Sequence, residues 1–189
     1  MKKFFLLAFA FLFSSCSVQY PATTNLSLNV ESQPAGVYNN DTSAALKGHD
    51  ARLDTAVVIY HFKGKTPVRI PNHKAPHILV TEQLATGLQQ QGLVFKSGSS
   101  VRIQVDLNDL VAIVTRPNIL YGTTAKSQLT LTIKNRGTSL IKTYNRQADR
   151  DSAGKPSVQD LEKMLNDQIN DIVHQILQDE EVQGAINKK

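Results

Sequence analysis

One side chain in this sequence has an obvious chemical use: the thiol of Cys16, the only cysteine among 189 residues. A lone cysteine cannot form an internal disulfide, so the fold does not depend on oxidation. The thiol follows two lysines, the ten apolar residues 4–13, and the small residues Ser14 and Ser15. Ten helical residues extend about 15 Å, roughly half the hydrocarbon thickness of a bilayer. The run is therefore typical of a secretory signal rather than of a membrane span.

The surroundings of Cys16 resemble the lipobox of bacterial lipoproteins, although Phe13 stands where these signals usually have leucine. In such signals the thiol is joined to diacylglycerol by a thioether, the chain is cut before the cysteine, and the new amino group is acylated. We therefore predict lipidation of Cys16 and a signal peptide over residues 1–15. The alternative is a simple secretory cut after Ser17, because Ser15 and Ser17 are small at the spacing that such sites use.

Other pairs with catalytic or ligand spacing are better explained as structure. Ser139 and Lys142 have the Ser-x-x-Lys spacing of some acyl-transfer enzymes, but they lie in an expected strand, which points them to opposite faces. His73 and His77 are four residues apart, like two ligands on a helix, but Pro76 places His73 outside any helix. We predict no catalytic residue, no metal site and no cofactor.

An enzyme of unfamiliar type would need the fold to bring Asp50, His61, Asp149 and Asp151 into one cleft. Asp149 and Asp151 are two residues apart, so they share a face if the chain is extended there. Their position shortly before Gly154 and Pro156 favours solvated turn residues instead. Scattered positions for the four residues would remove the basis for this hypothesis.

The charge distribution gives no sign of a nucleic-acid partner. The formal net charge is +5, from 21 basic and 16 acidic residues. Removal of residues 1–15, which include two lysines and no acidic residue, leaves +3. The basic residues are spread along the chain rather than clustered, whereas nucleic-acid binders concentrate them on one face. We predict no nucleic-acid binding.

The elements that would carry these residues can be read from the hydrophobic pattern. We interpret residues 16–24 as a tether and residues 25–189 as one domain. Alternation predicts a short strand at 26–30, and polar turn residues predict a loop at 31–42. Pro76 suits the first turn of a helix that stops before Gly92. Further short strands are expected at 44–47, 55–62 and 68–70.

The second half of the chain has the clearest periodicity. Apolar and polar residues alternate at 101–107 and at 129–133, whereas 110–114 is apolar on both faces. Gly137 marks a hairpin turn at 135–138. Ser157 and Asp160 form a capping box before an apolar helical stripe. We predict an α+β fold with a mostly antiparallel sheet and two amphipathic helices packed on one face.

The whole arrangement resembles the YajG family of bacterial lipoproteins. The resemblance is carried by Cys16, the sequence Gly48-His-Asp-Ala-Arg52, the helix ending at Gly92, the two alternating strands and the long carboxy-terminal helix. It implies a lipid-anchored, periplasm-facing protein of the outer membrane, and Ser17 is not the aspartate that usually retains lipoproteins in the inner membrane. It implies no reaction. The simplest role for Asp50 and Arg52 is an ion pair or turn at the end of a strand.

Two non-enzymatic functions remain open. The first is a binding or assembly module for another envelope protein, which could join an edge strand by β-augmentation. The second is a carrier or binder of a small lipid or peptidoglycan fragment, which would need a cavity between the helices and the sheet. The sequence identifies neither the partner nor the ligand.

Overall fold

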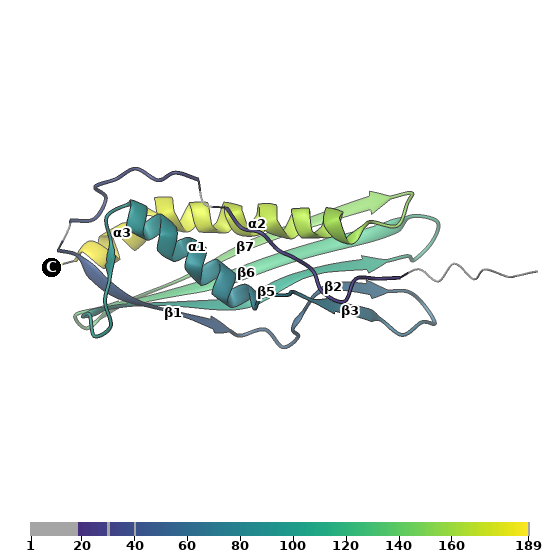
Figure 1. The fold of residues 1–189 in the computed structure, drawn as a ribbon, viewed down its shortest axis with the longest axis horizontal. Helices are drawn as coiled ribbons and strands as arrows, with labels where there is room; N and C mark the ends of the chain where they lie inside the picture. The colour runs from purple at the N-terminus through teal and green to yellow at the C-terminus, as the bar shows by residue number, and fades with distance from the viewer. Residues whose placement is uncertain (1–18, 30, 40, 189) are drawn as a thin grey trace, which may run out of the picture.

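The computed structural model describes residues 19–29, 31–39 and 41–188, so Cys16 and the expected signal peptide lie outside the described residues. Figure 1 shows an elongated molecule in which helices lie along a curved sheet. The α+β class is confirmed. The elements are β1 (Ser43–Asp50), β2 (Ala56–His61), β3 (Val68–Pro71), α1 (Pro76–Gln90), β4 (Val94–Phe95), β5 (Val101–Thr115), β6 (Tyr121–Asn135), β7 (Thr138–Ser152), α2 (Val158–Gln178) and α3 (Glu180–Asn187).

The seven-stranded sheet is mixed, so the prediction of a mostly antiparallel sheet is wrong. The long strands β5, β6 and β7 are antiparallel neighbours, and β3 is antiparallel to β2. In contrast, β1 and β2 both run parallel to β5, and β4 runs parallel to β1. The connection from β2 to β5 contains α1, and such a crossover permits parallel pairing. The continuous apolar run in β2 is typical of a strand buried on both faces.

β1 and β2 together act as one interrupted strand along β5. Because β6 pairs with nearly the whole length of β5, β1 and β2 must share its other edge. Asp50 pairs with Leu107 and Val58 pairs with Ala112. The chain therefore advances eight residues from β1 to β2 while β5 advances only five. The surplus residues loop out at 51–55, and the register of β5 against β6 also shifts just after Leu107.

The long helix α2 begins where the sequence predicts. Ser157 and Asp160 form the expected capping box, and the apolar stripe is buried at Leu161, Leu165, Ile169, Ile172, Val173 and Ile176. A buried amide also joins α2 to the sheet: Gln168 accepts a hydrogen bond from Ser127 at 2.7 Å and donates one to the carbonyl of Ala125 at 3.2 Å. These bonds satisfy polar groups that would be costly to bury unpaired.

Helix α1 lies beside α2, as Figure 1 shows. A glycine inside a helix is typical of a site where a neighbouring element approaches closely, and at Gly87 in α1 that element is α2. A Cβ atom added to Gly87 would lie 2.3 Å from Cδ1 of Leu177 in α2. Gln91, at the end of α1, donates a hydrogen bond to the carbonyl of Leu177 at 2.8 Å. The glycine therefore allows two helices to pack closely.

Two local predictions have opposite outcomes. The turn between β6 and β7 is confirmed, with positive φ angles of 45° at Arg136 and 81° at Gly137. Positive φ at both central residues suits the right-handed twist of a hairpin. The short strand predicted at 26–30 is wrong as far as its described residues 26–29 go, since they lie outside any strand. Thr24 alone forms an isolated bridge, with Asn72.

Residues 25–29 are held by side chains of α2 instead of by a strand. The backbone N–H groups of alternate residues donate to acceptors one helical turn apart: Asn25 to Glu162 (2.7 Å), Ser27 to Asn166 (3.1 Å) and Asn29 to Asn170 (3.2 Å). Two residues of extended chain advance about 6.6 Å and four helical residues about 6 Å, so the two repeats nearly match. The amino-terminal segment is thereby fixed along the helix.

Candidate functional site

The chain approaches the expected lipidation site from one end of the sheet. Figure 1 shows the first described residues leaving the molecule beside the ends of β2 and β3. The ring of Tyr20 packs against that of Tyr60 in a tilted arrangement with centroids 4.7 Å apart, and the ammonium of Lys155 lies 4.3 Å from the Tyr20 centroid. The point at which the chain leaves the domain is therefore determined by side-chain contacts.

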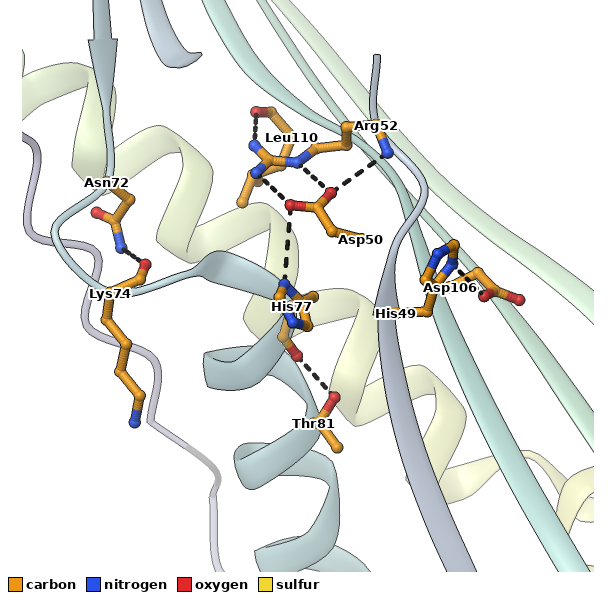
Figure 2. Close-up of polar contacts among 9 residues, drawn as sticks. All are labelled: His49, Asp50, Arg52, Asn72, Lys74, His77, Thr81, Asp106 and Leu110. Atoms are coloured by element: carbon orange, nitrogen blue, oxygen red, sulfur yellow. Dashed lines mark hydrogen bonds and ion pairs between the residues drawn. The ribbon is translucent and has the colours of Figure 1, made fainter. Parts of the chain in front are cut away.

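The Gly48–Arg52 stretch forms a partly buried ion pair between Asp50 and Arg52 at the gap between β1 and β2 (Figure 2). Both guanidinium nitrogens Nε and Nη2 of Arg52 donate to the carboxylate of Asp50 at 2.8 Å. The Arg52 side chain is only 5% exposed and that of Asp50 is 25% exposed. Nη1 of Arg52 also lies 3.5 Å from the carbonyl oxygen of Leu110 in β5, past the point where β1 ends. The expected strand-terminal ion pair is confirmed.

The electrostatics of this pair favour a structural role. Hydrogen bonding to Arg52 holds the pKa of Asp50 below its ordinary value, so the carboxylate stays ionised at neutral pH. His77, in the first turn of α1, places Nδ1 3.7 Å from the Asp50 carboxylate. A carboxylate held ionised by a bidentate arginine is a poor general base. The group joins β1, β5 and the start of α1.

Gly48 makes this junction close enough to form. A Cβ atom at Gly48 would lie 1.9 Å from Oγ1 of Thr81 and 3.2 Å from the carbonyl oxygen of His77. The Thr81 hydroxyl in turn donates to that carbonyl at 2.6 Å. The glycine is required by the approach of α1 to β1, which is a packing function rather than a ligand-binding one.

The four residues that an unfamiliar enzyme would need are not gathered. Asp50 pairs with buried Leu107 and so faces the helices, whereas Asp151 pairs with Gly122 on the opposite face of the sheet. His61 lies three strand spacings from Asp151, about 14 Å along one row of the sheet. Asp149 lies in β7 rather than in a turn, and accepts a hydrogen bond from Thr124 at 2.6 Å. These positions give no common cleft.

The other pairs considered from the sequence are also separate. Ser139 and Lys142 are both in β7, where Lys142 pairs with Asp179 at 2.6 Å on the helix side. His73 lies before α1 and His77 within it. In the described part of the chain, no three His, Cys, Asp or Glu side chains are grouped to hold a metal ion.

A basic hollow on the outer face of the sheet was not identified from the sequence. It has a volume of about 340 Å³, and Lys47, Arg102 and Lys134 are among its lining residues. The three come from β1, β5 and β6, which register places side by side, with Arg102 directly opposite Lys134. Each of the three residues lies on the polar face of an alternating strand. The turn at Gly137 determines the register of β6 against β7, but it does not determine how β1 pairs with β5. The juxtaposition of β1 with β5 depends on a parallel pairing that alternation does not specify.

Apolar side chains fill the centre of the layer between the helices and the sheet, whereas an open hollow of about 460 Å³ lies at its edge between α1, β1 and β4. Leu84 and Leu88 of α1, Leu165 of α2, and Leu107 and Leu129 of the sheet are each at most 1% exposed and belong to one apolar cluster. This packing counts against an enclosed ligand cavity in the centre of that layer. No helix within the described ranges is long and apolar enough to cross a membrane.

Comparison with known families places these features in a recognised group. A model of an uncharacterized lipoprotein family matches residues 18–187. The chain belongs to this family. The lipoprotein character that the sequence predicts is confirmed at that level. Among functionally curated proteins, none matches the chain.

Solved structures share the fold of this lipoprotein. A Xanthomonas campestris protein of the DUF330 family has a TM-score of 0.58 at 8% identity, over 86% of this chain and 97% of its own. A protein described only as uncharacterized has a TM-score of 0.51 at 14% identity, over 83% and 97%. A minor lipoprotein from Acinetobacter baumannii has a TM-score of 0.41 at 14% identity, over 76% and 93%. The first two matches indicate a shared fold alone.

Proposed function

We propose that this lipoprotein is anchored by acyl chains on Cys16 and faces the periplasm from the outer membrane, as a YajG-like protein would. The family match supports a lipoprotein, and Cys16 is the only thiol available for the linkage. Residues 1–15 are removed in this proposal. Three acyl chains on one residue give stable anchoring, since a single chain binds only marginally.

We further propose that the domain acts by binding another envelope protein, without catalysis. The observation that carries this proposal is the edge strand β7, which has 15 residues and pairs only with β6 among the described strands. Thr143, Asn145 and Gln147 are exposed along it. An extended segment of a partner could add to this edge through main-chain hydrogen bonds.

The helix side of β7 restricts which partners can join. Lys142 pairs with Asp179 and Glu181, and Arg146 donates to Gln175 at 3.0 Å. Charged side chains on an edge strand oppose indiscriminate pairing with other sheets. A specific partner strand would therefore need side chains that are complementary to Lys142 and Arg146.

In-cell photocrosslinking tests the edge directly. A crosslinking amino acid is placed in turn at Thr143, Asn145 and Gln147, with Gln89 on the exposed side of α1 as the control position. We expect the three β7 positions to crosslink to adjacent parts of one envelope protein. This crosslinked product should disappear when Cys16 is changed to Ser, and Gln89 should give no crosslinked product. Identical products from Gln89, or no product from β7, would contradict β-augmentation at this edge.

The basic hollow favours a second candidate, the binding of a small anionic lipid or peptidoglycan fragment. Lys47, Arg102 and Lys134 supply three cations in one depression, and Gln104 and Thr132 add hydrogen-bonding groups. Arg102→Gln should then weaken the binding of soluble peptidoglycan fragments about tenfold, whereas Lys126→Gln, outside this hollow, should not. Equal binding by the two variants would remove this candidate.

A further inference from the structure

Three turns meet at the end of the molecule from which the amino-terminal segment leaves. Register brings them together, because His61 pairs with Thr115 and Tyr121 pairs with Ser152. The turns cover residues 62–67, 116–120 and 153–156, and Figure 1 shows this end opposite the one that carries the carboxy-terminus. We call these three turns, together with Tyr20, the anchor end.

The anchor end exposes apolar side chains that the fold does not use. Ile119 is 81% exposed and Leu120 is 46% exposed, both at the tip between β5 and β6. Behind them the rings of Tyr20, Tyr60, Phe62 and Tyr121 form a row with successive centroids 4.7, 6.2 and 5.9 Å apart. Tyr60 is buried, whereas Tyr20, Phe62 and Tyr121 are only partly buried. Amphipathic tyrosine rings are enriched at membrane–water interfaces, so Tyr20 and Tyr121 beside exposed aliphatic groups suit such a position.

The charges of the anchor end fit the same surroundings. Its turns carry Lys63, Lys65, Arg116 and Lys155 and contain no acidic residue. Anionic lipid headgroups attract such side chains within about a Debye length, roughly 8 Å at physiological salt. The turns at the opposite end, 96–100 and 135–138, are also basic but contain no aliphatic or aromatic residue. The combination of apolar and basic groups therefore distinguishes the turns of the anchor end from these two turns.

The short connection to the lipid places the anchor end at the bilayer. Two residues, Ser17 and Val18, lie between Cys16 and Gln19, and the three steps from one to the other can cover at most about 11 Å of chain. Tyr20 is fixed on Tyr60, and Thr24 is fixed by hydrogen bonds to Pro71 and Asn72. A lipid on Cys16 therefore cannot hold this end far from the surface.

We propose that the anchor end is a second membrane contact, in which Ile119 and Leu120 enter the headgroup layer and the neighbouring lysines and arginine meet anionic lipids. The proposal rests on the proposed lipidation of Cys16. It orients the long axis of the sheet away from the bilayer, so that the basic hollow and the β6–β7 turn face the periplasm. The folded domain thus binds the lipid surface itself, in addition to being held there by the acyl chains.

Site-specific fluorescence quenching tests the contact in the intact lipoprotein. Lipidation would consume the only native thiol, so one introduced cysteine can be labelled selectively: Asn118→Cys at the anchor end or Ser97→Cys at the opposite end. The strand β5 that separates them has 15 residues and spans about 45 Å. Each labelled protein is reconstituted into vesicles of phosphatidylcholine and phosphatidylglycerol that contain a headgroup quencher.

We expect the label at position 118 to be quenched at least about threefold more than the label at 97, because only the former lies at the headgroups. Changing Ile119 and Leu120 together to Ser should remove most of the difference, whereas Ile141→Ser, an exposed residue on β7, should leave it intact. Omission of phosphatidylglycerol should reduce the difference in quenching between the two labels. Equal quenching at 118 and 97, or a difference unaffected by the Ile119 and Leu120 changes, would overturn the proposed contact.

Failure of the anchor itself gives a different result. If Cys16 still reacts with maleimide and the protein does not float with the vesicles, lipidation is refuted and the second contact falls with it. If the protein floats with the vesicles but the two labels are equally quenched, lipidation stands and only the second contact is refuted. Contact with a protein rather than with lipid would appear as a difference in quenching in cell envelopes that is absent from pure lipid vesicles, and this would also overturn the proposal.

Discussion

Removal of the Asp50 carboxylate should destabilise the domain far more than removal of an exposed ion-pair partner. In Asp50→Ala, the guanidinium of Arg52 stays in a position where its side chain is 5% exposed. It loses both 2.8 Å hydrogen bonds and keeps only the 3.5 Å contact with the carbonyl of Leu110. An arginine left buried without its partner charge is the dominant cost of such a change.

The expected magnitude follows from the burial of the pair. Breaking a buried pair by removing one partner costs about 3–5 kcal/mol, and the partial exposure of Asp50 favours the lower figure of about 3 kcal/mol. For a domain of this size, each kcal/mol corresponds to about 2–4 °C in Tm, so Asp50→Ala should lower Tm by about 6–12 °C. The matched control is Lys163→Ala, whose pair with Asp167 is exposed and should contribute less than about 0.5 kcal/mol.

Urea unfolding followed by circular dichroism measures both variants. A second change, Arg52→Met in the Asp50→Ala background, should recover much of the loss because it removes the unpaired charge. The pKa of Asp50 is lowered in the folded state, so its stabilising contribution is present above the ordinary value of 3.8 and is lost as the pH falls towards the folded pKa. Equal losses for Asp50→Ala and Lys163→Ala, or no recovery with Arg52→Met, would refute the buried-pair account.

Three further perturbations test the packing around this site and the amino-terminal segment. Gly48→Ala should lower the Tm measured by thermal unfolding by several degrees, because the added methyl group clashes with Thr81. Adding Thr81→Ala should restore part of the lost Tm, and no recovery would contradict the clash as the cause. Asn72→Ala removes acceptors for Thr24 and the N–H of Leu26, so limited proteolysis should cut residues 20–29 faster, and unchanged cleavage would contradict the role of Asn72. Burial raises the pKa of Tyr60 to about 12, so the stabilisation from its neutral phenol is lost as the pH rises from about 10 towards 12. Tyr60→Phe should make the fall of stability in this range less steep, the rest being due to Tyr38 and Tyr144, whose pKa values burial also raises; an unchanged alkaline slope would contradict this.

Much of the fold could be predicted because long periodic segments specify their own structure. The stripe from Leu161 to Ile176 and the capping box at Ser157 determine α2 without reference to the rest of the chain. The turn at Arg136 and Gly137 determines the β6–β7 hairpin in the same way. In each case the signal and the structure lie within a few residues of each other.

The parallel pairings could not be predicted from alternation. The strands β1 and β2 run along β5 because the intervening α1 returns the chain, and the partner of each strand lies about fifty residues away. The apolar runs at 110–114 in β5 and in β2 are local features that favour strands covered on both faces. The strand predicted at 26–30 failed for a related reason, since its backbone N–H groups are satisfied by α2 side chains such as Asn166.

The candidate site was predicted in part. The pair of Asp50 and Arg52 is local and was expected, but its burial comes from the gap between β1 and β2, which only the tertiary structure reveals. The basic hollow and the anchor end each combine residues from separate strands. Neither has a signature in one segment, so neither follows from the sequence without the register of the sheet.

Anchoring and membrane contact both require the lipid at Cys16, and the intact mass of the mature protein purified from membranes tests for that lipid most directly. We predict a chain beginning at Cys16 whose mass exceeds that of the polypeptide by a diacylglyceryl group and one further acyl chain. A mass that corresponds to an unmodified chain beginning at Val18, after a secretory cut behind Ser17, would contradict the account.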